Sequence, residues 1–228
     1  MSLSGLGAVA IWHDLLPEAR DEFYEWHNRE HMPERVGIPG FHRGRRYAVI
    51  GSGPEYFNLY EAASFETLAG ADYLNRLNAP TAWTQRIVPS FRHVARALCR
   101  IAFTHGVGSG GVMLTLRFAV PDVAHAHVSS EMCTRLLPPL AYRKGIAGVH
   151  LGIADRAASS VVTEEKRVRA DVTIVPSWVV LIEGIGVPEV ESAVGELLPA
   201  LLAAGAHEID RSNYRLEFTR LKTPWTAG

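Results

Sequence analysis

The chain has 228 residues, of which 47% are apolar and 21% are charged, and its formal net charge is −1. This length and composition are typical of a globular protein with one large core or two small ones. The near-zero net charge provides no long-range field to attract nucleic acid or an anionic membrane, and every apolar run is too short to cross a bilayer. We therefore expect neither nucleic acid nor a membrane as a partner.

The first half of the sequence predicts the element order β-α-β-β-α-β. Apolar runs bounded by glycine and proline predict strands, whereas apolar residues three and four positions apart predict helices. Asp14 and Pro17 begin the first helix, and Pro33 is expected to end it. The expected elements are a strand at residues 7–12, a helix at 17–32, strands at 41–50 and 56–62, a helix at 65–77 and a strand at 94–103.

The second half predicts the same order of elements. They are a strand at residues 112–120, a helix at 123–137, strands at 150–154 and 173–183, a helix at 190–204 and a strand at 214–221. The charged, serine-rich residues 156–170 show neither helical nor strand periodicity, so we expect a loop insertion there. Each half therefore has the element order of a ferredoxin-like unit.

Internal repeats support a tandem duplication. The segment Gly37-Ile-Pro-Gly-Phe-His-Arg-Gly44 recurs as Gly145-Ile-Ala-Gly-Val-His-Leu-Gly152. Two shorter repeats follow in the same order, because residues 59–61 recur at 181–183 and residues 99–101 recur at 219–221. Three matches in one order favour duplication over chance. The alignment places Gly37 on Gly145 and Gly40 on Gly148.

A ferredoxin-like unit covers one face of its sheet with two helices and leaves the other face apolar and bare. Two fused copies can bury these bare faces against each other. We therefore expect an α+β fold with repeats at residues 1–105 and 106–228, whose antiparallel sheets pack face to face. The run Gly106-Val-Gly-Ser-Gly-Gly111 fits the G-x-G-x-x-G pattern, but a predicted strand follows it instead of the helix that a dinucleotide site requires. We interpret this run as a linker.

The two cysteines and the amino terminus indicate a cellular compartment. Cys99 and Cys133 lack the spacing of a metal or redox motif, and they are expected to be reduced. Residues 1–12 lack the basic and long apolar regions of a secretory signal peptide. These features predict a cytoplasmic protein.

The densest group of polar and aromatic residues lies at residues 23–35. On a helix, His27 and His31 are four positions apart and line up on one face with Tyr24. Histidine suits proton transfer because its pKa lies near neutrality. The same spacing occurs in zinc sites of the H-E-x-x-H type, but Asn28 occupies the glutamate position and no third ligand is evident. We therefore expect no metal.

The repeat alignment makes this histidine pair specific to the first copy. With Gly37 on Gly145, the alignment places His27 on Arg135 and His31 on Pro139. Such asymmetry is expected when one copy keeps a site and the other keeps only the structure. We predict that His31 lines a cavity in the first half and that apolar side chains fill the equivalent place in the second half.

The segment Trp26-His27…Glu30-His31-Met-Pro-Glu-Arg-Val-Gly-Ile-Pro-Gly-Phe41, followed by Arg45-Arg46-Tyr47, resembles the dimeric α/β-barrel superfamily, in particular its EthD-type and stress-responsive members. The resemblance covers residues 7–103. It implies short ferredoxin-like chains that pair through their sheets into a barrel. It also implies that His31 is the family histidine and that a pocket lies between helix and sheet.

These features together predict a cofactor-independent enzyme that acts on a small apolar or aromatic molecule. The reaction would involve proton transfer, of the cyclase, lyase, isomerase or monooxygenase type. His31 would carry the proton, assisted by His27 and Tyr24. Residues expected to bind the substrate are Arg45, Arg46, Tyr47, Trp26, Phe41 and Trp83.

Two other functions stay open at this stage. One is a non-catalytic ligand-binding or stress-associated module that uses the same pocket. The other is a haem protein resembling chlorite dismutase, which would need an axial histidine from the second copy, either His150 or His207. Members of the superfamily also associate beyond the barrel, so we expect a homodimer.

Overall fold

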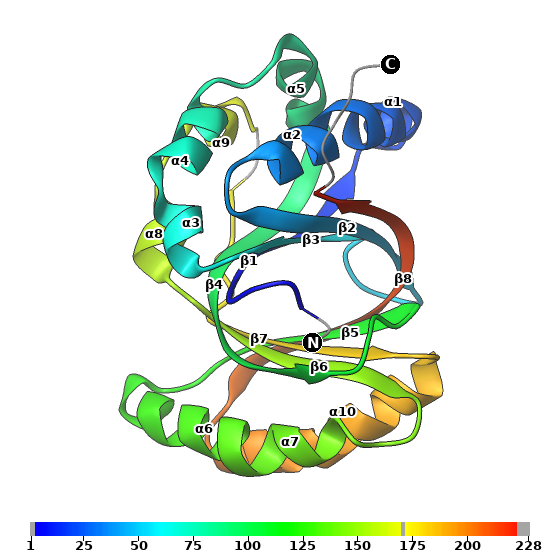
Figure 1. Ribbon diagram of the computed structural model, residues 1–228, viewed down its shortest axis with the longest axis vertical. Coiled ribbons are helices and arrows are strands. Elements are labelled where there is room, and N and C mark those ends of the chain that lie inside the picture. Colours follow the sequence, from blue (N-terminus) through cyan, green and yellow to red (C-terminus); the bar gives the residue numbers. More distant parts are fainter. Residues whose placement is uncertain (1–2, 170–171, 223–228) are drawn as a thin grey trace.

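A computed structural model describes residues 3–169 and 172–222, and in this part of the chain eight strands close into one antiparallel barrel (Figure 1). Around the barrel the order is β1-β3-β2-β8-β5-β7-β6-β4. The strands are β1 (Gly7–Leu15), β2 (Phe41–Ile50), β3 (Tyr56–Ala62), β4 (Phe91–Gly106), β5 (Val112–Ala119), β6 (Ile146–Ala154), β7 (Trp178–Gly184) and β8 (His207–Leu221).

The barrel consists of two ferredoxin-like sheets. Strands β4-β1-β3-β2 come from the first half and β8-β5-β7-β6 from the second, and the halves join through the β2–β8 and β4–β6 pairs. The expected α+β fold, a tandem version of the dimeric α/β barrel, is therefore confirmed. β4 runs to Gly106 and β5 begins at Val112, so the glycine-rich run connects two strands and opens no helix.

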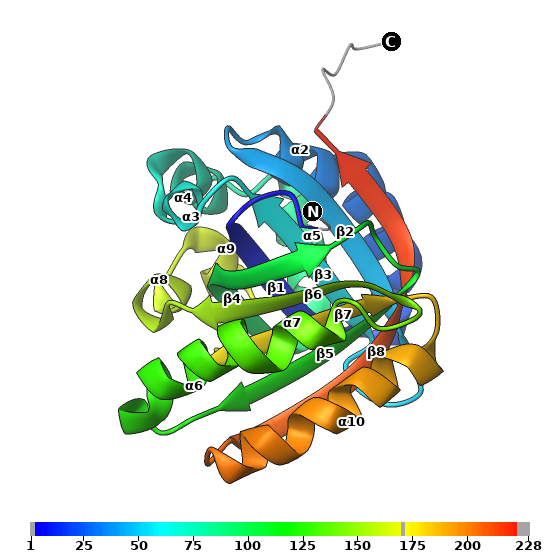
Figure 2. The ribbon, with the colours of Figure 1, turned by 60° about the horizontal axis from the view of Figure 1, so that its bottom comes forward.

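Helices cover the outside of both sheets (Figures 1 and 2). On the second half, α6, α7 and α10 lie side by side over β5, β6 and β7. None of the helices in residues 3–169 and 172–222 has the length and apolar character needed to cross a membrane. The α-helices are α1 (Arg20–Trp26), α2 (Met32–Gly37), α3 (Phe65–Ala69), α4 (Ala71–Asn78), α5 (Ala82–Ile87), α6 (His125–Glu131), α7 (Leu137–Leu140), α8 (Arg156–Ser160), α9 (Glu164–Val168) and α10 (Val187–Ala203).

The first helix does not end at Pro33, contrary to the sequence expectation. A π-helical turn, His27–His31, connects α1 to α2, and the helix continues through it to Gly37. In this turn the Met32 N–H bonds to the His27 carbonyl five positions earlier. Proline lacks an N–H and clashes with the preceding turn of an α-helix, and a wider turn accommodates both defects. The second copy has the same feature, a π-helical turn at Met132–Leu136 before Pro138.

The repeat alignment of Gly37 with Gly145 is also wrong. Gly40 and Gly145 occupy the same turn, with φ of +82° and +79°. Their carbonyls accept equivalent hydrogen bonds from Ala63 and Ile185. From β1 to β2, Gly40 of the first copy therefore corresponds to Gly145 of the second. The shared Gly-Ile-x-Gly-x-His-x-Gly run does not mark equivalent positions in the two copies.

The corrected register changes the counterparts of the histidines. The two π-helical turns align His27 with Met132 and His31 with Leu136, in place of Arg135 and Pro139. Met132 is fully buried in the second core, and Leu136 packs against it. Apolar side chains therefore do take the place of the histidines in the second copy.

The insertion at residues 156–170 is not a plain loop. It contains α8 and α9, and both pack on the first half of the chain, α8 against β4 and α9 against α4 and α5 (Figure 1). Asp155 and Thr163 cap these helices by accepting backbone hydrogen bonds from Ala158 and Lys166, which is why short helices form in a segment without apolar periodicity. The second copy thus contributes structure to the first.

Several boundaries also differ from the expected ones. β6 begins at Ile146 rather than at residue 150, and β8 begins at His207 rather than at residue 214, because pairing with neighbouring strands extends both beyond their apolar runs. The helix expected at 65–77 is broken at Gly70 into α3 and α4. The inner face of the barrel is filled by apolar and aromatic side chains, among them Trp12, Tyr47, Phe57 and Tyr214.

A buried ion network closes one end of the barrel. Arg45 donates to Glu61 of its own half at 3.0 Å and to Glu183 of the other half at 2.8 and 3.2 Å. His150 Nε2 lies 3.3 Å from the Glu183 carboxylate, and its Nδ1 lies 2.8 Å from the Thr104 hydroxyl. Arg45, Glu61, Glu183 and His150 are each at most 1% exposed.

The members of this network are equivalent in the two copies. Arg45 corresponds to His150, because Arg45 lies opposite Leu59 in one half and His150 lies opposite Leu181 in the other. Glu61 and Glu183 then correspond to each other. Although burial raises the pKa of Glu183, the hydrogen bonds and charges of His150 and Arg45 lower it to about 2. The carboxylate is therefore ionised, and it depends on Arg45 for its charge balance.

Replacing Arg45 by Met should lower the free energy of unfolding by about 3–5 kcal/mol, because the buried Glu183 carboxylate loses its arginine, whereas Glu61 keeps its pair with Arg43. Urea denaturation at neutral pH measures the change. As a control, Arg29→Ala removes an exposed pair with Glu25 and should cost less than about 1 kcal/mol. Equal losses in the two variants would contradict the role given to the network.

The closed barrel leaves no free strand edge among the described residues, so further association cannot use strand pairing at an edge. The expected homodimer would have twice the chain mass of 25.0 kDa in solution. Light scattering coupled to gel filtration tests this prediction. A single species near 25.0 kDa would contradict it.

Candidate functional site

Strand alternation separates the three consecutive residues that were expected to bind one substrate. Arg46 points outward, to the space between β2 and the first helix, where it bonds to His27. Arg45 and Tyr47 point into the barrel, where Arg45 joins the ion network and Tyr47 packs in the inner core. The structure therefore does not bring Arg45 and Tyr47 together with His31.

A cluster of buried polar side chains lies between the first helix and the outer face of β1, β2 and β3. We call it the histidine cluster, and all its members are at most 7% exposed. It is surrounded by aromatic rings, since Phe23 contacts both His13 and His27. The members of the cluster are His13, His27, His31, Arg46, Asn58 and Tyr60.

The hydrogen bonds of His27 define its tautomer. Nδ1 lies 3.1 Å from Arg46 Nη1, and because arginine can only donate, Nδ1 must accept. Nε2 therefore carries the proton and donates to the Tyr60 hydroxyl at 3.1 Å. Burial, and next the charge of Arg46, lower the pKa of His27 well below its usual value. His27 is thus a neutral ring with both nitrogens engaged, which suits a positioning role.

His31 has unused hydrogen-bonding capacity. Its ring packs on Trp26 at a centroid distance of 4.2 Å and on His27 at 5.6 Å. Among the described residues, its buried Nδ1 has no hydrogen-bond partner. Burial, and next the charge of Arg35, lower the pKa of His31 well below its usual value. The His31 ring is therefore neutral near neutral pH, and its Nδ1 is available to bind a ligand.

Residues from distant parts of the chain close the cluster. Arg35 is 3% exposed and forms ion pairs with Glu34 at 2.9 Å and with Glu165 of α9. On the other side, Arg46 pairs with Glu217 of β8 at 3.2 Å. The α9 insertion of the second copy therefore contacts the border of the first copy's site through Arg35.

The remaining predicted residues take different positions. Tyr24 lies at the rim, where its hydroxyl contacts Tyr56 at 3.2 Å. Trp26 is buried and donates to Thr84, whereas Phe41 packs in a separate core beside Tyr73. Trp83 donates to Glu22 near the surface. Of the predicted residues, His27, His31, Tyr24, Arg46 and Trp26 are brought together, and Trp83 packs at the edge of the same aromatic core. Phe41, Arg45 and Tyr47 lie elsewhere.

Sequence reasoning missed Tyr60, Asn58 and His13. Asn58 and Tyr60 alternate in β3 with the inward-facing Phe57 and Leu59, so the period of two marks them as outward-facing. Polar residues at alternate positions of a helix-covered strand were therefore an available signal. Nothing in the sequence indicated Glu165, because its contact with Arg35 depends on how the insertion folds.

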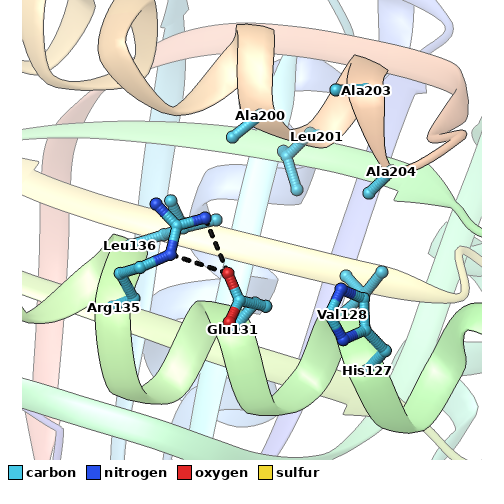
Figure 3. A pocket seen from close by; sticks show the side chains of 9 residues that line it. All are labelled: His127, Val128, Glu131, Arg135, Leu136, Ala200, Leu201, Ala203 and Ala204. Carbon is cyan, nitrogen blue, oxygen red and sulfur yellow. Dashed lines mark hydrogen bonds and ion pairs between the residues drawn. The ribbon is translucent and has the colours of Figure 1, made fainter.

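The cavities are not where the repeat argument placed them. In the first half, a groove of about 740 Å³ runs beside the cluster and is lined by Asn28, Pro33 and Lys222, among others, but not by His31. In the second half, a pocket of about 340 Å³ lies between α6 and α10, and Leu136, the counterpart of His31, lines it (Figure 3). The prediction that His31 lines a cavity is therefore wrong. At the equivalent position it is the second copy, which lacks the histidines, that has a pocket.

Of the two histidines considered as axial haem ligands, His150 is not available. His150 is 0% exposed and engages both ring nitrogens with Thr104 and Glu183, so neither is available as an axial ligand. His207 is exposed at the start of β8, and its Nδ1 lies 3.2 Å from the Gly205 carbonyl. In the described ranges, no group of three or more His, Cys, Asp or Glu side chains is arranged to hold a metal ion.

Comparison with known proteins gives structural but not sequence relatives. No family model matches the sequence, and no curated protein matches it at a significant level. A candidate monooxygenase of Fusobacterium nucleatum is 7% identical with a TM-score of 0.60, and 96% of each chain is covered. An anthrone oxidase-like protein is 14% identical with a TM-score of 0.61, covering 95% of this chain and 92% of the other. A candidate chlorite dismutase is 9% identical with a TM-score of 0.58, covering 94% and 96%.

The chain has the dimeric α/β-barrel fold. The coverage of more than nine-tenths on both sides means that these neighbours share the whole two-unit barrel and not one half of it. Identities of 14% or less leave the reaction to be argued from the site itself.

The buried histidines should make the protein acid-sensitive. Burial lowers the pKa of His13 to about 3 and those of His27 and His31 well below 6.5. The unfolded state then takes up protons first as the pH falls below about 6.5, so each histidine removes up to about 1.4 kcal/mol of stability per pH unit. Urea denaturation between about pH 7 and pH 5 should show this loss.

A His31→Gln variant is the control for this pH dependence. It removes one of four buried histidines whose pKa is lowered (His13, His27, His31 and His150) and should reduce the slope of stability against pH by about a quarter. The Glu183 carboxylate, with a pKa of about 2, contributes below this pH window. A slope that His31→Gln leaves unchanged would show that His31 is not a buried neutral ring.

Proposed function

We propose that this protein is a small-molecule enzyme without a bound metal or haem, in which His31 accepts a proton from an aromatic substrate. The observation that carries the proposal is the buried and unpartnered Nδ1 of His31, which has no hydrogen-bond partner among the described residues. A buried polar atom without a partner costs free energy, and such costs are concentrated at functional sites. The neighbouring His27, with both nitrogens engaged, has no comparable opening for a ligand.

The surroundings of His31 suit a flat apolar substrate. Trp26 stacks on one side of the ring, and Tyr60 presents an edge at a centroid distance of 6.2 Å. Burial raises the pKa of Tyr60, so its phenol stays protonated and can donate a hydrogen bond. In the proton-transfer step, a C–H bond beside a substrate carbonyl breaks, its electron pair remains as an enolate and the proton moves to His31. Tyr60 and the guanidinium of Arg46 are the nearby donors for the enolate oxygen.

Substrate entry requires movement of α9. A cavity of about 20 Å³, the size of a water molecule, is lined by Glu165 and Lys166 of α9 but by no member of the histidine cluster. The Arg35–Glu165 ion pair holds α9 at the border of the cluster. Opening of α9 would expose His31, and its closure would exclude water from the reaction.

The substrate class follows from the site and from one structural neighbour. Stacked aromatic walls and a neutral base favour a polycyclic phenolic ketone whose C–H is already acidic. The anthrone oxidase-like neighbour is named for a compound of this class. Anthrone is therefore the first substrate to test, with dioxygen supplied as the oxidant for any step after the proton transfer.

Purified protein should consume anthrone in aerated buffer, and His31→Ala should lower the rate by about 100-fold or more, the range for loss of a general base. Absorbance and chromatography of the product measure the rate. His42→Ala is the control, because His42 is an exposed histidine on the same half. Thermal melts of both variants verify that they are folded.

Two outcomes would contradict the proposal. If the wild-type protein binds anthrone without consuming it, the alternative of a non-catalytic binding module is correct. If His31→Ala retains the wild-type rate, catalysis does not use the histidine cluster.

A further inference from the structure

A second cavity lies at the end of the barrel opposite the ion network. Its volume is about 340 Å³, and its lining comes from the end of β5, the starts of β4 and β8, and the segment before β7. These positions meet at one rim because β5 is antiparallel to both β7 and β8. The apolar part of the lining is formed by Pro54, Ala95, Phe118, Ala119, Ile174, Val175 and Pro176.

Two strained backbone positions border this cavity. Among the described residues, His93 and Glu208 are the non-glycine residues with positive φ, at +50° and +52°, and both line the cavity. The two positions are equivalent, because each lies in a β-bulge in which two residues of one strand face a single residue of the neighbouring strand. That single residue is His13 of β1 for the His93 bulge and Phe118 of β5 for the Glu208 bulge. Both copies retain a costly conformation at this rim, and bulges of this kind are common beside binding sites.

Two guanidinium groups face the same cavity. Arg117 pairs with Asp210 and lies 4.8 Å from the centroid of the Trp12 ring, so its charge is partly balanced. Arg156 is exposed and donates to the Ser177 hydroxyl at 2.7 Å, and in the described part of the chain it has no ion pair. Arg156 is thus an oriented cation whose remaining donors are available. Glu208 and Asp210 are exposed acidic groups on the opposite strand of the rim, and of these Asp210 is paired with Arg117.

We propose that this rim cavity binds a small monocarboxylate with an apolar body, with Arg156 holding the carboxylate and Arg117 assisting it. Arginine presents paired N–H groups that match a carboxylate. The apolar lining provides contact for the rest of the molecule, and the volume lies in the range of small-ligand pockets. None of the residues that line this cavity belongs to the histidine cluster, although His93 lies on the strand next to His13.

Titration calorimetry with 1-naphthoate tests the proposal, with neutral 1-naphthamide as the matched ligand. Naphthoate should bind in about 1:1 ratio, and naphthamide should bind at least about tenfold more weakly. Arg156→Gln should weaken naphthoate binding by about tenfold or more, whereas Glu208→Gln should strengthen it, because a nearby negative charge is removed. Arg156 is exposed, so its replacement is not expected to impair folding.

Two control variants separate this site from other sources of binding. Arg167→Gln removes an exposed cation of α9, paired with Glu164, and should leave naphthoate affinity unchanged. His31→Ala should also leave it unchanged, so a failure of the proposed enzyme activity would not affect this result. Equal binding of naphthoate and naphthamide, an unchanged affinity in Arg156→Gln, or a loss in His31→Ala would each overturn the proposal.

Discussion

The closure of the barrel between the two halves is the constraint on which the rest of the structure depends. Each sheet has helices on one face only, so its inner face must be buried by the other sheet. The β2–β8 and β4–β6 pairs join the sheets, and Arg45 links the halves electrostatically through Glu61 and Glu183. Polar side chains at this end of the barrel are stable only because each has a partner from the opposite half or from its own.

Fusion of the two copies has allowed them to specialise. The first copy carries the histidine cluster, and the second has Met132 and Leu136 at the equivalent places. The second copy carries the longer connection before β7, and its α9 contacts the border of the cluster through Glu165 and Arg35. This contact is therefore supplied by the copy that lacks the histidines. In a symmetric pair of separate chains, each site would have the same residues and the same contacts.

The sequence was sufficient for the architecture but not for the register of the repeat. Element order and apolar periodicity predicted two ferredoxin-like units, and the hydrophobic inner faces required them to pair. The alignment of Gly37 with Gly145 failed because a left-handed turn needs one glycine, and Gly40 supplies it in the first copy. Pro33 suggested a helix end because proline usually ends an α-helix, whereas a π-helical turn before it lets this helix continue.

The candidate site was predictable in part for similar reasons. His27 and His31 came from helical spacing, which the π-helical turn preserved closely enough to keep both rings on the sheet side. Arg45, Arg46 and Tyr47 were grouped together although strand alternation must send them to opposite faces. Glu165 and the rim cavity depend on contacts between distant segments, which no local pattern in the sequence encodes.

The order of strands around the barrel also has a consequence for synthesis on the ribosome. β2, complete at Ile50, pairs on its outer edge with β8, which is the last strand of the described chain. The edge of β2 therefore stays unpaired until β8, at the end of the second half, has been translated. Nascent chains with an exposed strand edge are prone to aggregation and are bound by chaperones. Chaperone demand during translation should thus be greatest just before β8 emerges.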